Sequence, residues 1–342
     1  MEETLKENGQ ESQTGKVPEL ILAPIRGISD AVYRQAFIRC FKGFDRAMAP
    51  FVQPRRGKPL RPGERRQLSM EANCGLSVTP QVLTNNAETL LSSLRELRDL
   101  GHEEVNWNLG CPHPTTAGRG KGAGLLPHPE RIEAILAYVL PKAPVRISVK
   151  LRLGYRNPDD FQMVVEVLNR HPLSEVILHP RTAAQMYEGD IDLERAEQAF
   201  RLCLHRFVHS GDIRVPGDIV KARERLRGNP TAWMLGRGVL ANPFLVAWIK
   251  GRLPPDAERR RTLLRTFHDE LLEGYQTWLS GPGHLLNRMK QHWDFLAQAF
   301  ADPHRIRLRI RRSHDLATYA NAVTAAYDQP LATMHTNLEC NP

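Results

Sequence analysis

Short apolar runs alternate with amphipathic stretches along most of the chain, from Leu20 to about Ile249. The short runs have the length of buried strands, and the stretches between them space apolar residues three and four positions apart, as helices do. Eight strands separated by helices match a (β/α)8 TIM barrel in number and size, although a doubly wound sheet has the same alternation. The predicted strands are residues 20–23, 46–49, 77–83, 104–109, 146–151, 175–179, 206–209 and 232–235.

Helical patterns lie between most of these strands, which predicts an α/β protein with a mainly parallel sheet. The helix after the last strand is expected to start at a proline, because proline is tolerated in the first turn of a helix. The predicted helices are residues 30–39, 87–100, 129–139, 158–169, 192–202 and 215–225, and a last one from Asn242-Pro243 to Lys250.

The alternation of strands and helices stops at Leu253-Pro254-Pro255. From Glu258 onward there are only stretches with helical spacing, broken at Gly281-Pro282-Gly283 and at Asp302-Pro303, which predicts a small all-helical domain. The first residues are polar and lack the apolar core of a signal peptide. We therefore expect a disordered lead-in over residues 1–17, a catalytic barrel over 18–253 and a helical domain over 258–336.

The amino-acid composition indicates a soluble globular protein rather than a membrane protein or a small disulfide-rich one. With 342 residues, 41% hydrophobic and 25% charged, the chain is typical of a soluble globular protein, and no apolar run approaches a membrane span. The five cysteines are far apart and form no CxxC pair, so we expect neither a disulfide framework nor a metal site. This pattern favours the reducing cytoplasm.

The formal net charge of +9 is compatible with a polyanionic partner or with a basic surface of no particular function. One segment of the helical domain carries five arginines between His304 and Arg312. Such a run is commonly a solvated helix face, but planar guanidinium groups also suit phosphate oxygens. The candidate RNA-binding residues are Arg305, Arg307, Arg309, Arg311 and Arg312, with Arg288 and Lys290 from the preceding helix.

Polar or glycine residues follow most of the predicted strands at the carboxyl end. In a barrel these ends converge on one rim, which is the face that holds active sites. Cys111 lies just past its strand, after Gly110, where a thiol can act as an acid, a nucleophile or a metal ligand. The other strand-end candidates are Pro24, Ile25, Arg26, Gln81, Lys150, His179, Ser210, Gly211, Asp212, Gly236 and Arg237.

These residues suit a phosphorylated cofactor such as FMN. Gly236-Arg237-Gly238 lets the backbone approach a phosphate and supplies positive charge at the last strand. Lys150 would hold the electron-rich N1/O2 pole of a reduced flavin, while Gln81 would hydrogen-bond the edge of the ring. A flavin supplies the hydride chemistry, and the protein supplies orientation and a proton.

Several motifs occur in a fixed order along the chain, and together they are more specific than any one of them. They are Asn108-Leu109-Gly110-Cys111-Pro112, Gly122-Ala123-Gly124-Leu125-Leu126, Val149-Lys150-Leu151-Arg152-Leu153-Gly154, His179-Pro180-Arg181-Thr182, Gly211-Asp212-Ile213 and Leu235-Gly236-Arg237-Gly238.

From Leu22 to about Asn321 this arrangement resembles the flavin-dependent tRNA-dihydrouridine synthases. The resemblance implies an FMN-binding TIM barrel followed by a helical domain that helps to hold tRNA. It also implies that NADPH reduces FMN, that hydride passes to C6 of an extruded uridine, and that Cys111 protonates C5. The FMN-contacting positions would be Pro24, Ile25, Arg26, Gln81, Lys150, His179, Ser210, Gly211, Asp212, Gly236 and Arg237.

Four positions depart from the usual pattern of that family. Ile25 stands where methionine is common, Ser210 where asparagine is common, Thr116 where valine is common, and Arg26 where a small or acidic residue is common. These changes bear on the affinity for FMN and leave the cysteine and the lysine in place.

Other functions remain open on the residues alone. One is an FMN oxidoreductase acting on ribosomal RNA or a free pyrimidine, and another is a non-catalytic RNA-binding protein on the same scaffold. We expect a cytoplasmic monomer that binds tRNA, without a membrane or a metal. No short motif encodes which uridine is reduced.

Overall fold

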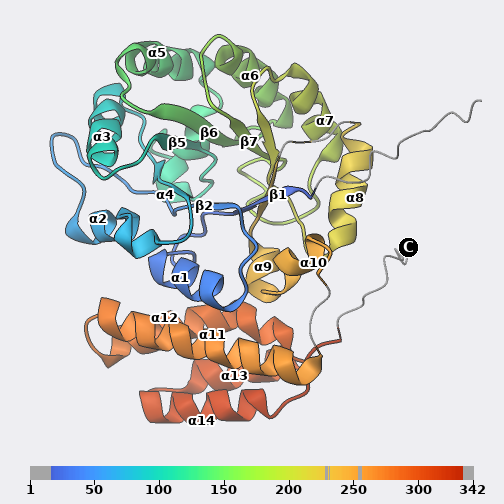
Figure 1. The fold of residues 1–342 in the computed structure, drawn as a ribbon. Helices are drawn as coiled ribbons and strands as arrows, with labels where there is room; N and C mark the ends of the chain where they lie inside the picture. Colours follow the sequence, from blue (N-terminus) through green and yellow to red (C-terminus); the bar gives the residue numbers. More distant parts are fainter. Residues whose placement is uncertain (1–16, 228–229, 231, 253–255, 334–342) are drawn as a thin grey trace, which may run out of the picture.

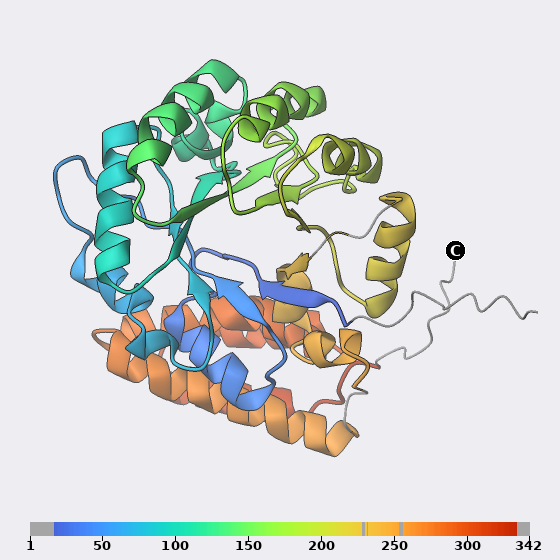
Figure 2. The same cartoon turned by 45° about the horizontal axis from the view of Figure 1, so that its top comes forward.

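The computed structural model describes residues 17–227, 230, 232–252 and 256–333 (Figure 1). Its parallel strands form one sheet in the order β3-β2-β1-β9-β8-β7-β6-β5-β4. The first and last strands of that order are adjacent in sequence, so the sheet curves round on itself as a barrel (Figure 2). The strands are β1 Glu19–Leu22, β2 Arg46–Met48, β3 Val78–Thr79, β4 Gln81–Val82, β5 Glu104–Leu109, β6 Arg146–Arg152, β7 Val176–His179, β8 Phe207–His209 and β9 Ala232–Leu235.

The predicted TIM barrel is confirmed, and the doubly wound alternative is excluded. One predicted strand, residues 77–83, is divided into β3 and β4 by Pro80. Proline has no N–H to donate to a ladder, so it interrupts the strand. Val78 and Thr79 pair with β2, whereas Gln81 and Val82 pair with β5. The break therefore lies where the two ends of the sheet meet.

Helices surround the barrel, and asparagine or aspartate caps several of them. Asp30 accepts from the Tyr33 amide at the start of α1, and Asn86 accepts from the Thr89 amide at the start of α3. The helices of this part are α1 Ala31–Cys40, α2 Pro62–Leu68, α3 Ala87–Asp99, α4 Pro114–Ala117, α5 Pro129–Val139, α6 Phe161–Asn169, α7 Leu193–Leu202, α8 Pro216–Arg225, α9 Arg237–Ala241 and α10 Leu245–Ile249.

The helix predicted from Asn242 to Lys250 is wrong in its extent. Two short helices, α9 and α10, occupy residues 237–249, and Asn242 and Pro243 lie between them. A residue before proline is pushed out of the helical region, and Asn242 has an extended backbone with φ −136° and ψ 91°. The first of these helices therefore begins directly at Arg237, on the strand-end motif itself.

Four longer helices follow the barrel, as the sequence predicts. The two that come first, α11 and α12, lie against the barrel, with α13 and α14 beyond them (Figure 1). Phe267 of α11 packs its ring against Tyr33 and Phe41 of the barrel, with centroids 5.6 and 5.1 Å apart. The bounds are α11 Ala257–Trp278, α12 Pro282–Leu296, α13 Pro303–Arg312 and α14 Leu316–Tyr327.

Some sequence predictions fall on residues that the structure does not describe. The predicted lead-in over 1–17 lies outside the described residues except for Val17, and so do the proline-rich boundary at 253–255 and the last residues of the helical domain, 334–336. Within the described residues, no helix is both long and apolar enough to cross a bilayer.

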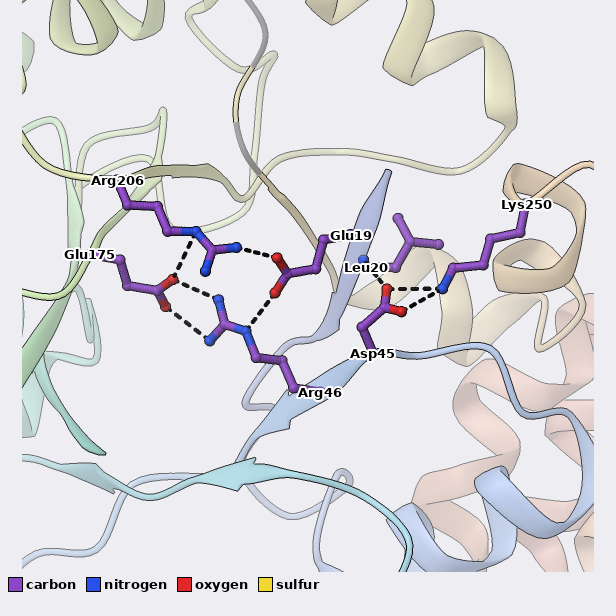
Figure 3. Close-up of polar contacts among 7 residues, drawn as sticks. All are labelled: Glu19, Leu20, Asp45, Arg46, Glu175, Arg206 and Lys250. Atoms are coloured by element: carbon purple, nitrogen blue, oxygen red, sulfur yellow. Dashed lines mark hydrogen bonds and ion pairs between the residues drawn. The ribbon is translucent and has the colours of Figure 1, made fainter. Parts of the chain in front are cut away.

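Charged residues join the amino-terminal ends of the strands (Figure 3). Arg46 donates to Glu19 at 2.7 Å and to both carboxylate oxygens of Glu175 at 3.0 and 2.6 Å. Arg206 also pairs with Glu19. The Glu175 side chain is only 3% exposed, so its charge depends on these arginines. These ion pairs neutralise charge at this end of the barrel, where the same four residues also line a cavity of about 720 Å³. The strand-end residues predicted from the sequence lie at the opposite end.

We predict that Arg46→Met lowers the free energy of unfolding by about 3 kcal/mol, because it leaves the buried Glu175 carboxylate without its main partner. The control is Arg146→Met at the same end of the barrel. Arg146 is 62% exposed and pairs only loosely with Glu103 and Glu104, so its loss costs less than about 1 kcal/mol. Urea denaturation of both variants measures the difference, and equal losses would contradict this description of the network.

Candidate active site

A cavity of about 480 Å³ opens at the carboxyl ends of the barrel strands. Every strand-end residue predicted from the sequence lines it, so the structure brings together groups from both halves of the barrel. The predicted lining residues are Pro24, Ile25, Arg26, Gln81, Cys111, Lys150, His179, Ser210, Gly211, Asp212, Gly236 and Arg237.

Lys150 of β6 places a cation in this cavity. Within the described residues its ammonium has neither a hydrogen bond nor an ion pair. Burial lowers the pKa of Lys150 to about 7, and the charge of the nearby Arg152 acts in the same direction. A cation that costs free energy to bury and has no anionic partner is suited to an electron-rich ligand.

A chain of amides lies beside Lys150 on β4 and β5. Asn108 donates to Gln81 Oε1 at 2.8 Å, and Gln81 donates to Asn106 Oδ1 at 2.8 Å. Asn106 donates in turn to Ser148 Oγ at 3.0 Å. These buried amides satisfy one another and hold Gln81 in one orientation. The sequence prediction missed Asn106 and Asn108, although two polar residues at alternating positions of a buried strand are a signal for such a chain.

Cys111 is held on its loop from two sides. The Asn108 side-chain oxygen accepts the backbone N–H groups of Gly110 and Cys111 at 2.9 and 2.8 Å. Gly122 has φ +57°, and a Cβ there would lie 2.9 Å from the Cβ of Cys111. Glycine is therefore needed at 122 for the glycine-rich run to pack behind the cysteine. The half-buried thiol is fixed at the wall of the cavity.

The last strands provide the most strongly charged wall of the cavity. Arg237 donates to Asp212 at 3.0 Å, and the buried Arg181 donates to both carboxylate oxygens of Asp212. Burial opposes the ionisation of Asp212, but the two arginines outweigh it and hold the pKa of Asp212 below its usual value. A Cβ on Gly238 would lie 2.0 Å from the Ile213 carbonyl, so only glycine allows this close approach of the two strand-end loops.

An exposed aromatic side chain, Tyr187, lies over this charged wall. The guanidinium groups of Arg152 and Arg237 lie 5.1 and 4.9 Å from the centre of its ring. His179 lies beneath, and burial followed by the charge of Arg152 lowers its pKa well below the usual value, so it is neutral at pH 7. Sequence reasoning assigned no role to Tyr187, Arg152 or Arg181; a tyrosine in a long loop has no periodic signal.

The predicted RNA-binding residues are not brought together in one cluster. Arg288 is bonded to the Gly27 carbonyl and to Asp30, and Lys290 to the Ser313 carbonyl. Arg311 pairs with Asp294 at 2.7 Å. The remaining arginines of α13 have no side-chain partner within the described residues and lie on a helix outside the barrel; they are Arg305, Arg307, Arg309 and Arg312.

The helical part also reaches the cavity. Phe295, near the end of α12, is one of its lining residues, and it directly follows Asp294, the partner of Arg311. Arg311 of α13 is therefore paired with the helix that contributes Phe295 to the cavity. Within the described residues, no group of three or more His, Cys, Asp or Glu side chains is placed to hold a metal ion.

We predict that Lys150→Met stabilises the ligand-free protein, and that this gain shrinks as the pH rises above 7. In the folded state the pKa of Lys150 is about 7, whereas its ordinary value is 10.5, so between these values the unfolded chain binds more protons. Wild-type stability then rises relative to the variant by up to about 1.4 kcal/mol per pH unit. Urea denaturation at several pH values tests this, and a gain that does not change with pH would show that Lys150 titrates normally.

Comparison with known proteins places this arrangement in a family. A family model described as dihydrouridine synthase (Dus) matches residues 21–330. A probable tRNA-dihydrouridine synthase of Rhodobacter capsulatus is 27% identical over 91% of this chain and 95% of its own length. A tRNA-dihydrouridine(16) synthase of Pseudomonas syringae is 25% identical over 87% of this chain and 95% of its own length.

Among solved structures, DHODH in complex with ferulenol from Eimeria tenella has a TM-score of 0.50 and 11% identity, covering 74% of this chain and 84% of that one. This likeness is one of fold alone. The match of the family model, in contrast, extends over the barrel and the four helices that follow it. The chain belongs to the dihydrouridine synthase family.

Proposed function

We propose that this protein reduces the C5–C6 double bond of a uridine in tRNA to give dihydrouridine, with FMN as cofactor and NADPH as reductant. The observation that carries the proposal is that Lys150, without a partner among the described residues, and Cys111 line one cavity in a chain of the dihydrouridine synthase family. Several of the relatives that match this chain are named for position 16 of tRNA, so position 16 is the first uridine to examine.

The donor groups of the cavity fit FMN. Arg237 and the backbone at Gly236 would hold the phosphate at the last strand, and Lys150 would lie at the electron-rich N1/O2 side of the ring. When bound, FMN supplies the hydride that C6 of the uracil receives. Arg237 also forms an ion pair with Asp212. The Asp212 carboxylate would therefore compete with the phosphate of FMN for the Arg237 guanidinium.

Cys111 is the proton donor in this proposal. Thiols are mostly protonated at neutral pH, and a thiol at the cavity wall can give its proton to C5 as a general acid. Asn108 holds the loop of Cys111 by accepting two backbone N–H groups and also orients Gln81, so one side chain fixes both groups. Positioning of this kind is what a general acid needs for efficient transfer.

The uridine must leave the RNA stack to enter a cavity of this kind. The arginines of α13 that have no partner among the described residues are suited to the phosphates of the surrounding RNA. We therefore propose tRNA as the partner, with a monomeric enzyme acting in the cytoplasm. A ribosomal RNA or free-pyrimidine substrate is less favoured, because the relatives that match the chain are named for tRNA.

A purely RNA-binding role is also less favoured. Such a protein has no use for an unpaired ammonium group and a thiol in the same cavity, since burial of the cation lowers stability without a ligand. A cofactor that supplies a negative group beside Lys150 would offset the free-energy cost of burying this cation.

We predict that Cys111→Ala retains FMN but loses about 10²–10⁴-fold in turnover, because one positioned general acid contributes that much. The measurement is dihydrouridine formed in unmodified tRNA, in the presence of FMN and NADPH. Cys74→Ala serves as control, since Cys74 is exposed and outside the cavity. Normal turnover by the Cys111 variant would remove the thiol from the mechanism.

We also predict that Arg305→Gln/Arg309→Gln weakens tRNA binding and flattens its dependence on salt, by roughly one unit of slope for each phosphate that is no longer neutralised. The matched control is Arg95→Gln/Arg98→Gln, which removes two exposed arginines from α3 on the barrel. Binding is followed by filter retention over a range of salt concentrations. Equal slopes for the two double variants would place the RNA on another surface.

A further inference from the structure

The first wall of the cavity is a tight loop that follows β1. Pro24, Ile25 and Arg26 of this loop line the cavity. The loop turns back at Gly27, which has φ +82°, and closes with bonds between Ile25 and Ser29: the Ile25 amide donates to Ser29 Oγ at 2.7 Å, and the Ser29 amide donates to the Ile25 carbonyl at 3.0 Å. The position of this wall therefore depends on what holds the turn at Gly27.

Arg288 of α12 holds that turn from the helical domain. Its Nη1 donates to the carbonyl of Gly27 and to Asp30 Oδ2, the latter at 3.1 Å. Gly27 lies in the turn, and Asp30 caps α1 directly after it, so one guanidinium group joins the turn to the start of the helix. Hydrogen bonds from a charged donor are about twice as strong as neutral ones. The arginine thus joins a helix of the second domain to a loop of the barrel.

A second set of bonds fixes Asp30 from the same domain. Tyr275 of α11 donates its hydroxyl to Asp30 Oδ1 at 2.8 Å, and His292 of α12 lies 2.9 Å from the Tyr275 oxygen. Because the single hydroxyl proton is used on Asp30, His292 must donate through Nε2. Burial lowers the pKa of His292 to about 3, so a neutral imidazole donates to a buried tyrosine, which donates to a carboxylate.

We propose that Arg288 and Tyr275 are positioning residues for the cofactor cavity. They act through Gly27 and Asp30 to hold the loop of residues 24–26, so the helical domain is a structural part of the active site. This inference rests on the proposed function in one respect only, that the cavity binds FMN.

The same helix connects the loop to the RNA-binding side. Arg288 contacts the loop, Phe295 lines the cavity, and Asp294 pairs with Arg311 of α13. Helix α12 therefore contacts both the loop that forms the first wall of the cavity and α13. The Arg288 guanidinium contacts the Gly27 carbonyl and Asp30. These contacts give Arg288 a role within the protein that requires no contact with RNA.

The test compares Arg288→Gln and Tyr275→Phe with Glu270→Gln. Glu270 of α11 pairs with Arg39 of α1 at 2.8 Å, so the control also removes an ion pair between barrel and helical domain, away from the loop. Amide hydrogen exchange of residues 24–30 is measured first, since it needs neither cofactor nor activity. We expect faster exchange in this segment for Arg288→Gln and Tyr275→Phe and wild-type exchange for the control.

Binding of FMN is measured next, by quenching of its fluorescence. We expect Kd to rise roughly tenfold in Arg288→Gln, the size of one broken charge-assisted hydrogen bond, and to recover in part in Arg288→Lys. The salt dependence of tRNA binding should stay at the wild-type slope, because Arg288 neutralises no phosphate in this proposal.

The outcomes separate the two proposals. Unchanged exchange over residues 24–30 in both loop variants would overturn the positioning role, and so would a flattened salt slope in Arg288→Gln, which would make Arg288 an RNA contact. Faster exchange with wild-type affinity for FMN would also overturn it, because the loop would then not matter to the cavity. If the wild-type protein fails to bind FMN while the loop variants exchange faster, the proposed function is wrong. Arg288 and Tyr275 would then still be shown to stabilise the loop of residues 24–26.

Discussion

Parallel strands bring their carboxyl ends to one edge of a sheet, and closure of this sheet at Pro80 turns that edge into a ring. Because Val78–Thr79 pairs with one neighbouring strand and Gln81–Val82 with the other, groups from β1 and β9 face groups from β4 and β5 across a single cavity. Without closure, Cys111 and Arg237 would lie on separate parts of an open sheet. The candidate active site is a consequence of this topology.

The two ends of the barrel differ in whether their charged side chains have partners of opposite charge. At the amino-terminal end, Arg46 and Glu175 form an ion pair at 2.6 Å, and Glu19 and Arg206 extend it to a network of two anions and two cations. At the other end, Lys150 has no partner in the described residues, and burial keeps its pKa near 7. The first arrangement pairs each charge with an opposite one, whereas the second leaves a cation without a partner among the described residues. This contrast favours the carboxyl-terminal end of the barrel as the candidate site.

Much of the site could be predicted from the sequence because strand ends are read from the apolar pattern. Gln81, Lys150 and His179 needed only the assignment of their strands to be placed at the rim. The partner of a charged side chain cannot be read in this way. Arg288 is separated from Gly27 by 261 residues, so their hydrogen bond could not be predicted from the sequence. The sequence shows only that Arg288 lies on a basic helix.

Local features limited other predictions. The helix predicted from Asn242 to Lys250 forms only over Leu245–Ile249, and a separate short helix, Arg237–Ala241, precedes it. Pro243 keeps Asn242 out of the helical region, so the two helices do not join. Tyr187 lies in a loop whose conformation is set by tertiary contacts, and α2 follows a loop without a clear apolar period. Sequence patterns therefore recovered the barrel and its rim, and tertiary structure was needed for the contacts between the two domains.

The most direct measurement is the visible absorption spectrum of the protein with FMN under anaerobic conditions, first with NADPH and then with unmodified tRNA. We expect a bound flavin whose absorbance disappears with NADPH and returns when tRNA is added, with dihydrouridine in the recovered RNA. A protein that stays colourless after incubation with FMN, or a reduced flavin that tRNA leaves reduced, would contradict the proposed function.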